Sequence, residues 1–126
     1  MFSHMAVGSN DIERSRKFYD ATFAAMGAGP GTLDPKGRLV YAHAGAKFLV
    51  TRPLDGAAAT AGNGSTVGLA MTAEQADAWH AAGVEAGGTA VESPPGVRDF
   101  GAMKLYLAYL RDPDGNKLCA LCPLAD

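Results

Sequence analysis

Apolar residues recur at helical spacing in one stretch near the start of the chain. Between residues 12 and 26 one set repeats every three or four positions, while charged residues occupy the intervening positions. Asn10 or Asp11 is a good N-cap, Glu13 suits the first turn of a helix, and Gly27 is a helix end. The pattern therefore predicts an amphipathic helix with a buried face of Ile12, Ser15, Phe18, Tyr19, Thr22, Phe23 and Met26.

Short apolar runs surround this helix in the first half of the chain. Phe2–Gly8 precedes it, and Arg38–Ala44 and Ala46–Arg52 follow as two predicted strands around Gly45. The Gly/Pro-rich segment Gly29–Gly37 has room for a short irregular strand. The first half therefore reads as one strand, one helix and about three strands.

The same order is predicted again after a flexible segment of small residues at Pro53–Gly64. Thr72 and Gln75 form a capping box, which starts a second helix. That helix has one packing face, and Gly87-Gly88 ends it. The expected parts of the second half are a strand at Ser65–Met71, the helix face of Ala76, Trp79, Ala82 and Gly83, a strand at Thr89–Glu92 and a loop at Ser93–Ala102.

A β-hairpin closes the chain. Met103–Arg111 and Asn116–Cys122 are apolar-rich runs on either side of a tight turn. Asp112 is suited to accept hydrogen bonds from the turn, Pro113 fixes one backbone angle, and Gly115 takes the left-handed conformation. The spacing predicts a type I turn followed by a bulge.

Composition narrows the class of protein. The chain has 126 residues, of which 48% are hydrophobic and 19% charged, and a formal net charge of −2. No basic cluster favours nucleic acid or a membrane surface, and no apolar run approaches the roughly 20 residues of a membrane span. The N-terminal sequence M-F-S-H-M lacks the plan of a signal peptide, and two cysteines are typical of a reducing compartment. We therefore expect a cytoplasmic protein with no nucleic-acid or membrane partner.

Three motifs carry a resemblance to a known group of proteins. They are F-S-H-M-A-V-G-S-N-D-I-E-R-S-R-K-F-Y-D at Phe2–Asp20, G-N-G-S-T-V-G-L-A-M at Gly62–Met71 and Y-L-R-D-P-D-G-N-K-L at Tyr109–Leu118. With the duplicated order of elements, they make the chain resemble the vicinal oxygen chelate superfamily, which includes glyoxalase I, bleomycin-resistance proteins and extradiol dioxygenases. Small glyoxalase-like bacterial proteins are the most similar in character.

The resemblance implies an α+β fold. Two βαβββ modules, about 1–53 and 65–124, are joined by a linker at 54–64 within a single domain spanning 1–126. In this fold the modules form a curved mixed sheet around an open cup. The superfamily also implies a homodimer, and the loop at Ser93–Ala102 is long enough to be a lid or a dimer contact.

The resemblance further implies a divalent metal in the cup, held by the first and last strands of each module. Carried over by position, the ligand sites fall on His4, Thr66, Leu49 and Cys119. His4 matches the ligand of the superfamily, whereas Thr66 is a poor metal donor and Leu49 has no donor atom. Zinc and nickel sites need three or four donors. We therefore expect a degenerate site and no cofactor. The alternative is that His4 and Cys119 bind Zn, Ni or Mn weakly when a substrate or water completes the shell.

Other candidate chemistry is sparse. Cys119 and Cys122 form C-x-x-C, but residues three apart on a strand point to opposite faces, which disfavours a redox or zinc pair. His43 lies on a predicted strand with either orientation open, and His80 lies on the second helix. No serine-histidine-aspartate spacing, phosphate-binding glycine loop or carboxylate pair is present.

Alternation along the strands from His4 predicts which residues line the cup. Tyr109 occupies the position at which fosfomycin-resistance relatives place an inward aromatic residue. An apolar lining with a few convergent polar groups is typical of a small-molecule site, although such positions also simply pack cores. The expected ligand-binding residues are His4, Leu49, Thr51, Thr66, Leu107, Tyr109, Cys119 and Leu121, with Ala6 and Gly68 on the same faces.

Three functions remain open at this point. The first is binding of a small, partly apolar ligand in the cup, without metal. The second is a metal-dependent lyase or isomerase of the lactoylglutathione lyase type that uses His4 and Cys119. The third is a purely structural or regulatory dimer.

Overall fold

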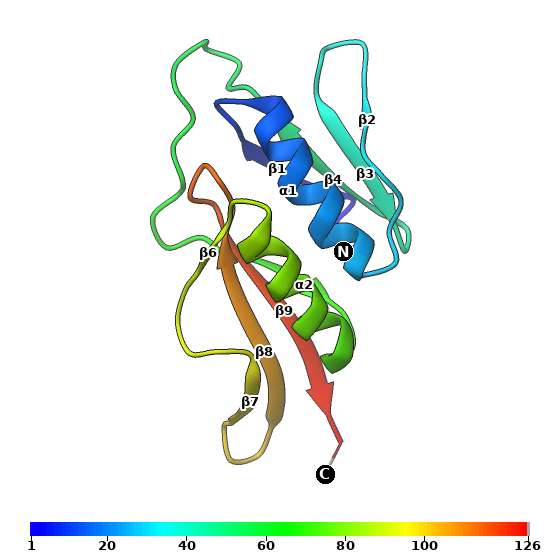
Figure 1. Cartoon of the computed structure of the whole chain (residues 1–126), viewed down its shortest axis with the longest axis vertical. Helices are drawn as coiled ribbons and strands as arrows, with labels where there is room; N and C mark the ends of the chain where they lie inside the picture. The colour runs from blue at the N-terminus through cyan, green and yellow to red at the C-terminus, as the bar shows by residue number, and fades with distance from the viewer. Residues whose placement is uncertain (126) are drawn as a thin grey trace.

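The computed structural model describes residues 1–125 and contains one sheet and one helix from each half of the chain (Figure 1). In the first sheet the strand order is β1-β4-β3-β2. β1 runs parallel to β4, and the other pairs are antiparallel. The elements of this first module are β1 (His4–Gly8), α1 (Ile12–Ala25), β2 (Thr32–Leu33), β3 (Leu39–His43) and β4 (Ala46–Thr51).

The second module repeats this plan with one additional strand. Its strand order is β5-β9-β8-β6, with β7 also paired to β8, and β5 runs parallel to β9. Its elements are β5 (Val67–Ala70), α2 (Ala73–Glu85), β6 (Thr89–Ala90), β7 (Gly96–Asp99), β8 (Lys104–Arg111) and β9 (Lys117–Leu124). The α+β class and the duplicated order are confirmed.

Both helices have the predicted caps and faces. The side chain of Asp11 accepts a hydrogen bond from the backbone N–H of Arg14, and Thr72 and Gln75 form a complete capping box. The predicted face of α1 is buried along its whole length, from Ile12 to Met26. The hydrophobic period therefore fixed this face correctly.

The two helices pack against each other at the centre of the molecule, and each also covers one face of its own sheet (Figure 1). Gly83 on α2 permits the close approach. A Cβ atom there would lie 2.3 Å from Cδ1 of Leu110 and 3.3 Å from Cε1 of Phe18. The core therefore extends from one module into the other through the helix pair.

The closing hairpin has the predicted turn. Asp112 N–H donates to the carbonyl of Asn116, Gly115 N–H donates to the carbonyl of Asp112, and Gly115 has a φ of 91°. Positive φ is costly for residues with a Cβ, which explains the glycine. The type I turn with a bulge is confirmed.

Two predictions between α2 and β8 were wrong. The strand expected at Thr89–Glu92 ends at Ala90, because Glu92 has a φ of 59°. The loop expected at Ser93–Ala102 contains β7, which pairs with the first half of β8 while β6 pairs with its end. The Pro94-Pro95 pair explains the interruption, since proline supplies no N–H for a ladder.

No helix within residues 1–125 is long and apolar enough to cross a membrane. No helix or strand lies between β4 and β5 in the described chain. This segment is nevertheless anchored, because the side-chain amide of Asn10 donates to the carbonyl of Ala59 and its oxygen accepts from the Ala59 N–H.

Candidate ligand-binding site

The first module contributes predicted site residues on the sheet face opposite α1, which we call its cup face. Leu49 pairs with Ala6, and Thr51 pairs with Gly8 in the parallel β1–β4 ladder. The alternate residues Phe48 and Val50 pack under α1. Leu49 and Thr51 are half-buried. The strand period therefore assigned this face correctly.

His4 lies at the start of β1 and is exposed. Its Nδ1 shares a hydrogen bond of 2.8 Å with the hydroxyl of Ser3. This neighbour holds one ring nitrogen and leaves Nε2 free for other partners. His4 is therefore an accessible imidazole rather than a buried core histidine.

The second module brings four predicted site residues together on its own cup face, opposite α2. Tyr109 pairs with Cys119, and Leu107 pairs with Leu121, in the antiparallel β8–β9 ladder. Leu107 and Cys119 are each only 5% exposed. These four side chains form a continuous patch, because directly opposed residues on two strands are neighbours on the same face.

Thr66 lies beside this patch but outside the sheet. The predicted strand began at Ser65, whereas β5 begins at Val67, so Thr66 precedes the ladder. It is exposed, and two residues later Gly68 pairs with Cys119. The position of Thr66 is near the expected one, but the β-ladder does not fix its side chain.

The two groups of predicted residues lie on different sheets. β1 and β5 are each an edge strand, and no strand pairing joins the sheets within the described residues. His4, Leu49 and Thr51 belong to one sheet, while Tyr109 and Cys119 belong to the other. One chain therefore presents two separate cup faces, each carrying part of the predicted lining.

Charged side chains also lie on the cup face of the second module. Nζ of Lys117 lies 4.9 Å from the centre of the Tyr109 ring and forms an ion pair with Glu92. Lys117 and Arg111 are two residues from Cys119 and Tyr109 and so share their face. The predicted lining did not include these three residues. Extending the same alternation to the strand ends would have found both cations, whereas nothing local predicted Glu92.

The environment keeps the Cys119 thiol protonated. Burial raises the pKa of Cys119, and the nearby Tyr109 hydroxyl and Lys117 only partly oppose this rise. Burial is also the main cause of the raised pKa of Tyr109, and the neighbouring Cys119 adds to it. Because the thiolate is the nucleophile and the metal ligand, Cys119 is suited to apolar contact and weak hydrogen bonding.

The residues at the metal positions do not fit a resident divalent ion. Leu49 has no donor atom, Thr66 offers a neutral hydroxyl, and Cys119 is held protonated. His4 lies on the other sheet. Within residues 1–125 no three His, Cys, Asp or Glu side chains are grouped closely enough to hold a metal. The four positions therefore lack the three or four donors of a zinc or nickel site.

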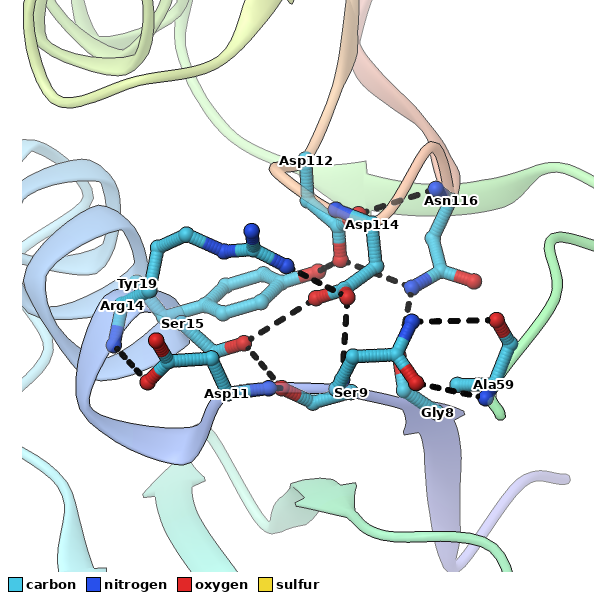
Figure 2. Close-up of polar contacts among 11 residues, drawn as sticks. Gly8, Ser9, Asp11, Arg14, Ser15, Tyr19, Ala59, Asp112, Asp114 and Asn116 are labelled. Carbon is cyan, nitrogen blue, oxygen red and sulfur yellow. Dashed lines mark hydrogen bonds and ion pairs between the residues drawn. The ribbon is translucent and has the colours of Figure 1, made fainter. Parts of the chain in front are cut away.

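The D-P-D-G-N turn, which carried much of the resemblance, has a structural role (Figure 2). One carboxylate oxygen of Asp112 accepts the Tyr19 hydroxyl at 2.6 Å and the side-chain amide of Asn116 at 2.8 Å. Its other oxygen accepts the backbone N–H groups of Asp114 and Asn116. Burial and the Asp112 carboxylate raise the pKa of Tyr19, so this phenol stays a donor.

Asp114 in the same turn binds the start of α1 (Figure 2). It accepts the backbone N–H of Asn10 at 2.9 Å, the guanidinium of Arg14 at 2.8 Å and the hydroxyl of Ser15. Asn116 donates to the carbonyl of Gly8. The turn therefore fastens the second module to the first, and we call this group of contacts the hairpin clamp.

An apolar cavity of about 280 Å³ lies between the first module and β5. Phe23, Phe48 and Met26 of the first module and Val67 and Leu69 of β5 contribute to its wall. The same residues pack in or against the helix-side core. Exposed Phe2 and Met5 stand at this cavity, beside the free edge of β1.

Comparisons with known proteins place the chain in the glyoxalase-like domain family. A family model described as "Glyoxalase-like domain" matches residues 4–121. A solved glyoxalase/bleomycin resistance protein from Albidiferax ferrireducens is 56% identical, with a TM-score of 0.92 over 96% of this chain and 98% of that one. No curated protein matches the chain.

More distant solved structures share the fold. One is a glyoxalase/bleomycin resistance protein/dioxygenase family enzyme from Burkholderia phytofirmans, with 19% identity and a TM-score of 0.73 over 97% of this chain and 98% of that one. Another is a possible glyoxalase from Bacillus cereus, with 18% identity and a TM-score of 0.66 over the same shares.

Proposed function

Because the chain belongs to the glyoxalase-like domain family, we propose that it binds a small, partly apolar molecule on its cup faces without a resident metal. The observation that carries this proposal is the cup face of the second module. Leu121 and Tyr109 are half-buried and provide accessible apolar surface and a hydroxyl there, and Leu107 and Cys119 lie buried beside them on the same face. An apolar surface with few polar groups is the usual character of a small-molecule site.

A thermal-shift screen of small metabolites and antibiotics tests this function. A true ligand at 100 times its dissociation constant adds about 2.7 kcal/mol to the free energy of unfolding. Tyr109→Phe removes the hydroxyl on the cup face and is expected to weaken that ligand. Tyr106→Phe is the matched control, because Tyr106 lies on β8 but packs against the helix-side core. Equal loss in both variants would contradict a site on the cup face.

We propose that the working form is a homodimer in which the first module of one chain meets the second module of the other. The free edges of β1 and β5 support this, as do the exposed apolar side chains of Phe2 and Met5 beside β1. Unpaired strand edges are ready templates for pairing with another chain. We expect an isologous interface above roughly 1,000 Å² in total.

Sedimentation at tens of micromolar tests the dimer. The expected species has twice the 13.0 kDa mass of the chain. Met5→Lys, which places a charge beside the free edge of β1, is expected to favour the monomer, whereas Lys104→Met on β8 is a control away from that edge. A wild-type protein that sediments only as a monomer would contradict the proposal.

The alternative function is a metal-dependent lyase or isomerase of the lactoylglutathione lyase type. The retained, accessible His4 favours it, but the mechanism also needs Cys119 in its ionised form, and burial raises the pKa of that thiol. Metal analysis of the purified protein decides between the two. About one Zn, Ni or Mn per chain would replace the binding proposal, whereas well under one supports it.

We also propose a cytoplasmic location. Cys119 and Cys122 are both free thiols, which fits a reducing compartment. Fractionation of the native host with an antibody to the chain tests this, and recovery outside the cytoplasm would contradict it.

A further inference from the structure

A hollow of about 380 Å³ opens at the end of the cup face of the second module. Residues 61–66 form one side of it, and Arg111 and Lys117 form the other. This lining contains two cations, the polar side chains of Asn63, Ser65 and Thr66, and no acidic residue. Its polar character differs from the apolar patch of Leu107, Tyr109, Cys119 and Leu121 that it adjoins.

The two cations are direct cross-strand partners. Arg111 on β8 pairs with Lys117 on β9 at the end of the ladder. Like charges directly opposite on two strands are destabilising, so this pair needs compensation. The sheet therefore concentrates positive charge at one point of the cup face.

Only one of these charges is balanced. Lys117 forms an ion pair with Glu92, while Arg111 donates to the carbonyl of Gly115 and, within the described part of the chain, forms no ion pair. The nearby carboxylates are engaged elsewhere: Asp112 binds Tyr19, and Asp114 binds Arg14. The hollow is thus left with an uncompensated guanidinium, which is exposed to incoming ligand.

Glu92 has an uncommon backbone conformation. Its φ of 59° is sparsely populated for residues with a Cβ, and its carboxylate meets Lys117. Strain of this kind clusters at binding sites, where the surrounding structure holds it in place. Here the conformation places a carboxylate on Lys117 and leaves Arg111 as the free anion-binding group.

We propose that this hollow is an oxyanion subsite, in which Arg111, aided by Lys117, binds the carboxylate or phosphate group of a ligand whose apolar body lies along Tyr109 and Leu121. The inference rests on the proposed function, because the body of the ligand occupies the cup face described above. It specifies the ligand class as an organic anion with an apolar part. Guanidinium groups suit this task, since their fork geometry matches carboxylate and phosphate oxygens.

Inorganic phosphate and acetate test the subsite separately from the rest of the site. Each is titrated into ¹⁵N-labelled protein at constant ionic strength, with amide shifts as the readout. The expected shifts cluster at Asn63, Gly64 and Thr66. They are expected to disappear in Arg111→Met and to persist in Lys104→Met, which removes the same charge at the opposite end of β8. No shift in wild type with either anion, or equal shifts in both variants, would overturn the proposal.

Benzoate and benzamide then link the subsite to the cup face. Benzoate is expected to bind at least roughly 10-fold more tightly than neutral benzamide, with Arg111→Met removing most of the difference and Arg111→Lys restoring part of it. Equal binding of both compounds would contradict the oxyanion subsite but would not affect the proposed function. Benzoate binding that needs Arg111 but is unchanged in Tyr109→Ala would keep the subsite and contradict the proposed function.

Discussion

The first module packs a cluster of four aromatic rings between α1 and its sheet, whereas the second module packs mainly small and aliphatic side chains against α2. The rings belong to Tyr19, Phe23, Tyr41 and Phe48, with centroid separations of 4.7–6.3 Å. Against α2 the fully buried positions are Ala76, Ala108, Leu110, Leu118 and Ala120 around Trp79. The same order of elements is thus filled in two different ways.

The two cup faces differ in how deeply their side chains are buried. In the first module His4 is exposed and Leu49 is half-buried, while in the second Leu107 and Cys119 are almost fully buried. Lys117, Glu92 and Arg111 add three charged groups on the second face, whereas Lys47, opposite His4, lies on the first. The two modules therefore share an order of elements but differ in the side chains on their cup faces. The first module supplies an aromatic core and the surface that the hairpin clamp binds, and the second supplies most of the candidate chemistry.

The largest expected effect comes from cutting the hairpin clamp that joins the two modules. Asp112→Ala removes a 3% exposed carboxylate with four hydrogen bonds and leaves the Tyr19 hydroxyl without its acceptor. We expect the free energy of unfolding to fall by about 3–5 kcal/mol. Urea unfolding followed by fluorescence of the single tryptophan, Trp79, measures it. Asp55→Ala in the linker is the control, and equal midpoints for the two variants would show that the clamp does not couple the modules.

The next effect tests why the second module uses small side chains. Gly83→Val places atoms where the nearest neighbour, Cδ1 of Leu110, is already 2.3 Å from an added Cβ. Overpacking against Leu110 of β8 and against Thr22 and Phe18 of α1 is expected to cost about 3 kcal/mol. Ala81→Val on the exposed face of α2 is the matched control. If both variants melt alike, the small residues are not there to bring the helices together.

A smaller effect is expected at the turn of the second module. Gly115→Val forces a β-branched residue to a φ of 91°. The strain is expected to cost about 1–3 kcal/mol. Thermal unfolding measures this loss. Gly68→Val is a useful comparison, because Gly68 has no neighbour within 4 Å of an added Cβ and no positive φ. A Gly115→Val variant that melts with wild type would contradict the turn geometry.

Local patterns predicted the elements whose cause is local. The period of apolar residues identified the buried face of α1, and the Asp112–Gly115 turn followed from residues within a few positions of one another. β7 was not predicted because Pro94, Pro95 and Gly96 give no local strand signal, and this strand forms by pairing with β8. The positive φ of Glu92 has no local sequence signal either.

The arrangement of residues far apart in the sequence was not predicted by local patterns. Alternation states which face of a strand a residue occupies, but not which faces meet, so the predicted lining divides between two sheets. The clamp was missed because Tyr19 and Asp112 are 93 positions apart. The D-P-D-G-N motif indicated the family correctly, yet its contacts hold the modules together. A motif that identifies a fold does not have to lie in its binding site.

The smallest expected effect is the pH dependence of the Cys119 thiol, which lies on the second cup face. Burial raises the pKa of Cys119, so the folded protein holds the thiol proton more tightly than the unfolded chain does. The corresponding stability is fully present below the unfolded-state pKa and is lost as pH rises through the folded-state pKa. Between pH 7 and 8, iodoacetamide is therefore expected to alkylate Cys119 slowly, with a rate that increases only at more alkaline pH.

Mass spectrometry of Cys122→Ser isolates the reaction of Cys119, and Cys119→Ser reports the other thiol. Lys117→Met is expected to slow Cys119 further, because Lys117 lowers the pKa of that thiol. A Cys119 that reacts faster than a free thiol at pH 7 would mean that the second cup face stabilises a thiolate. In that case Cys119 would not serve only as an apolar contact, and the metal-dependent alternative would gain a donor.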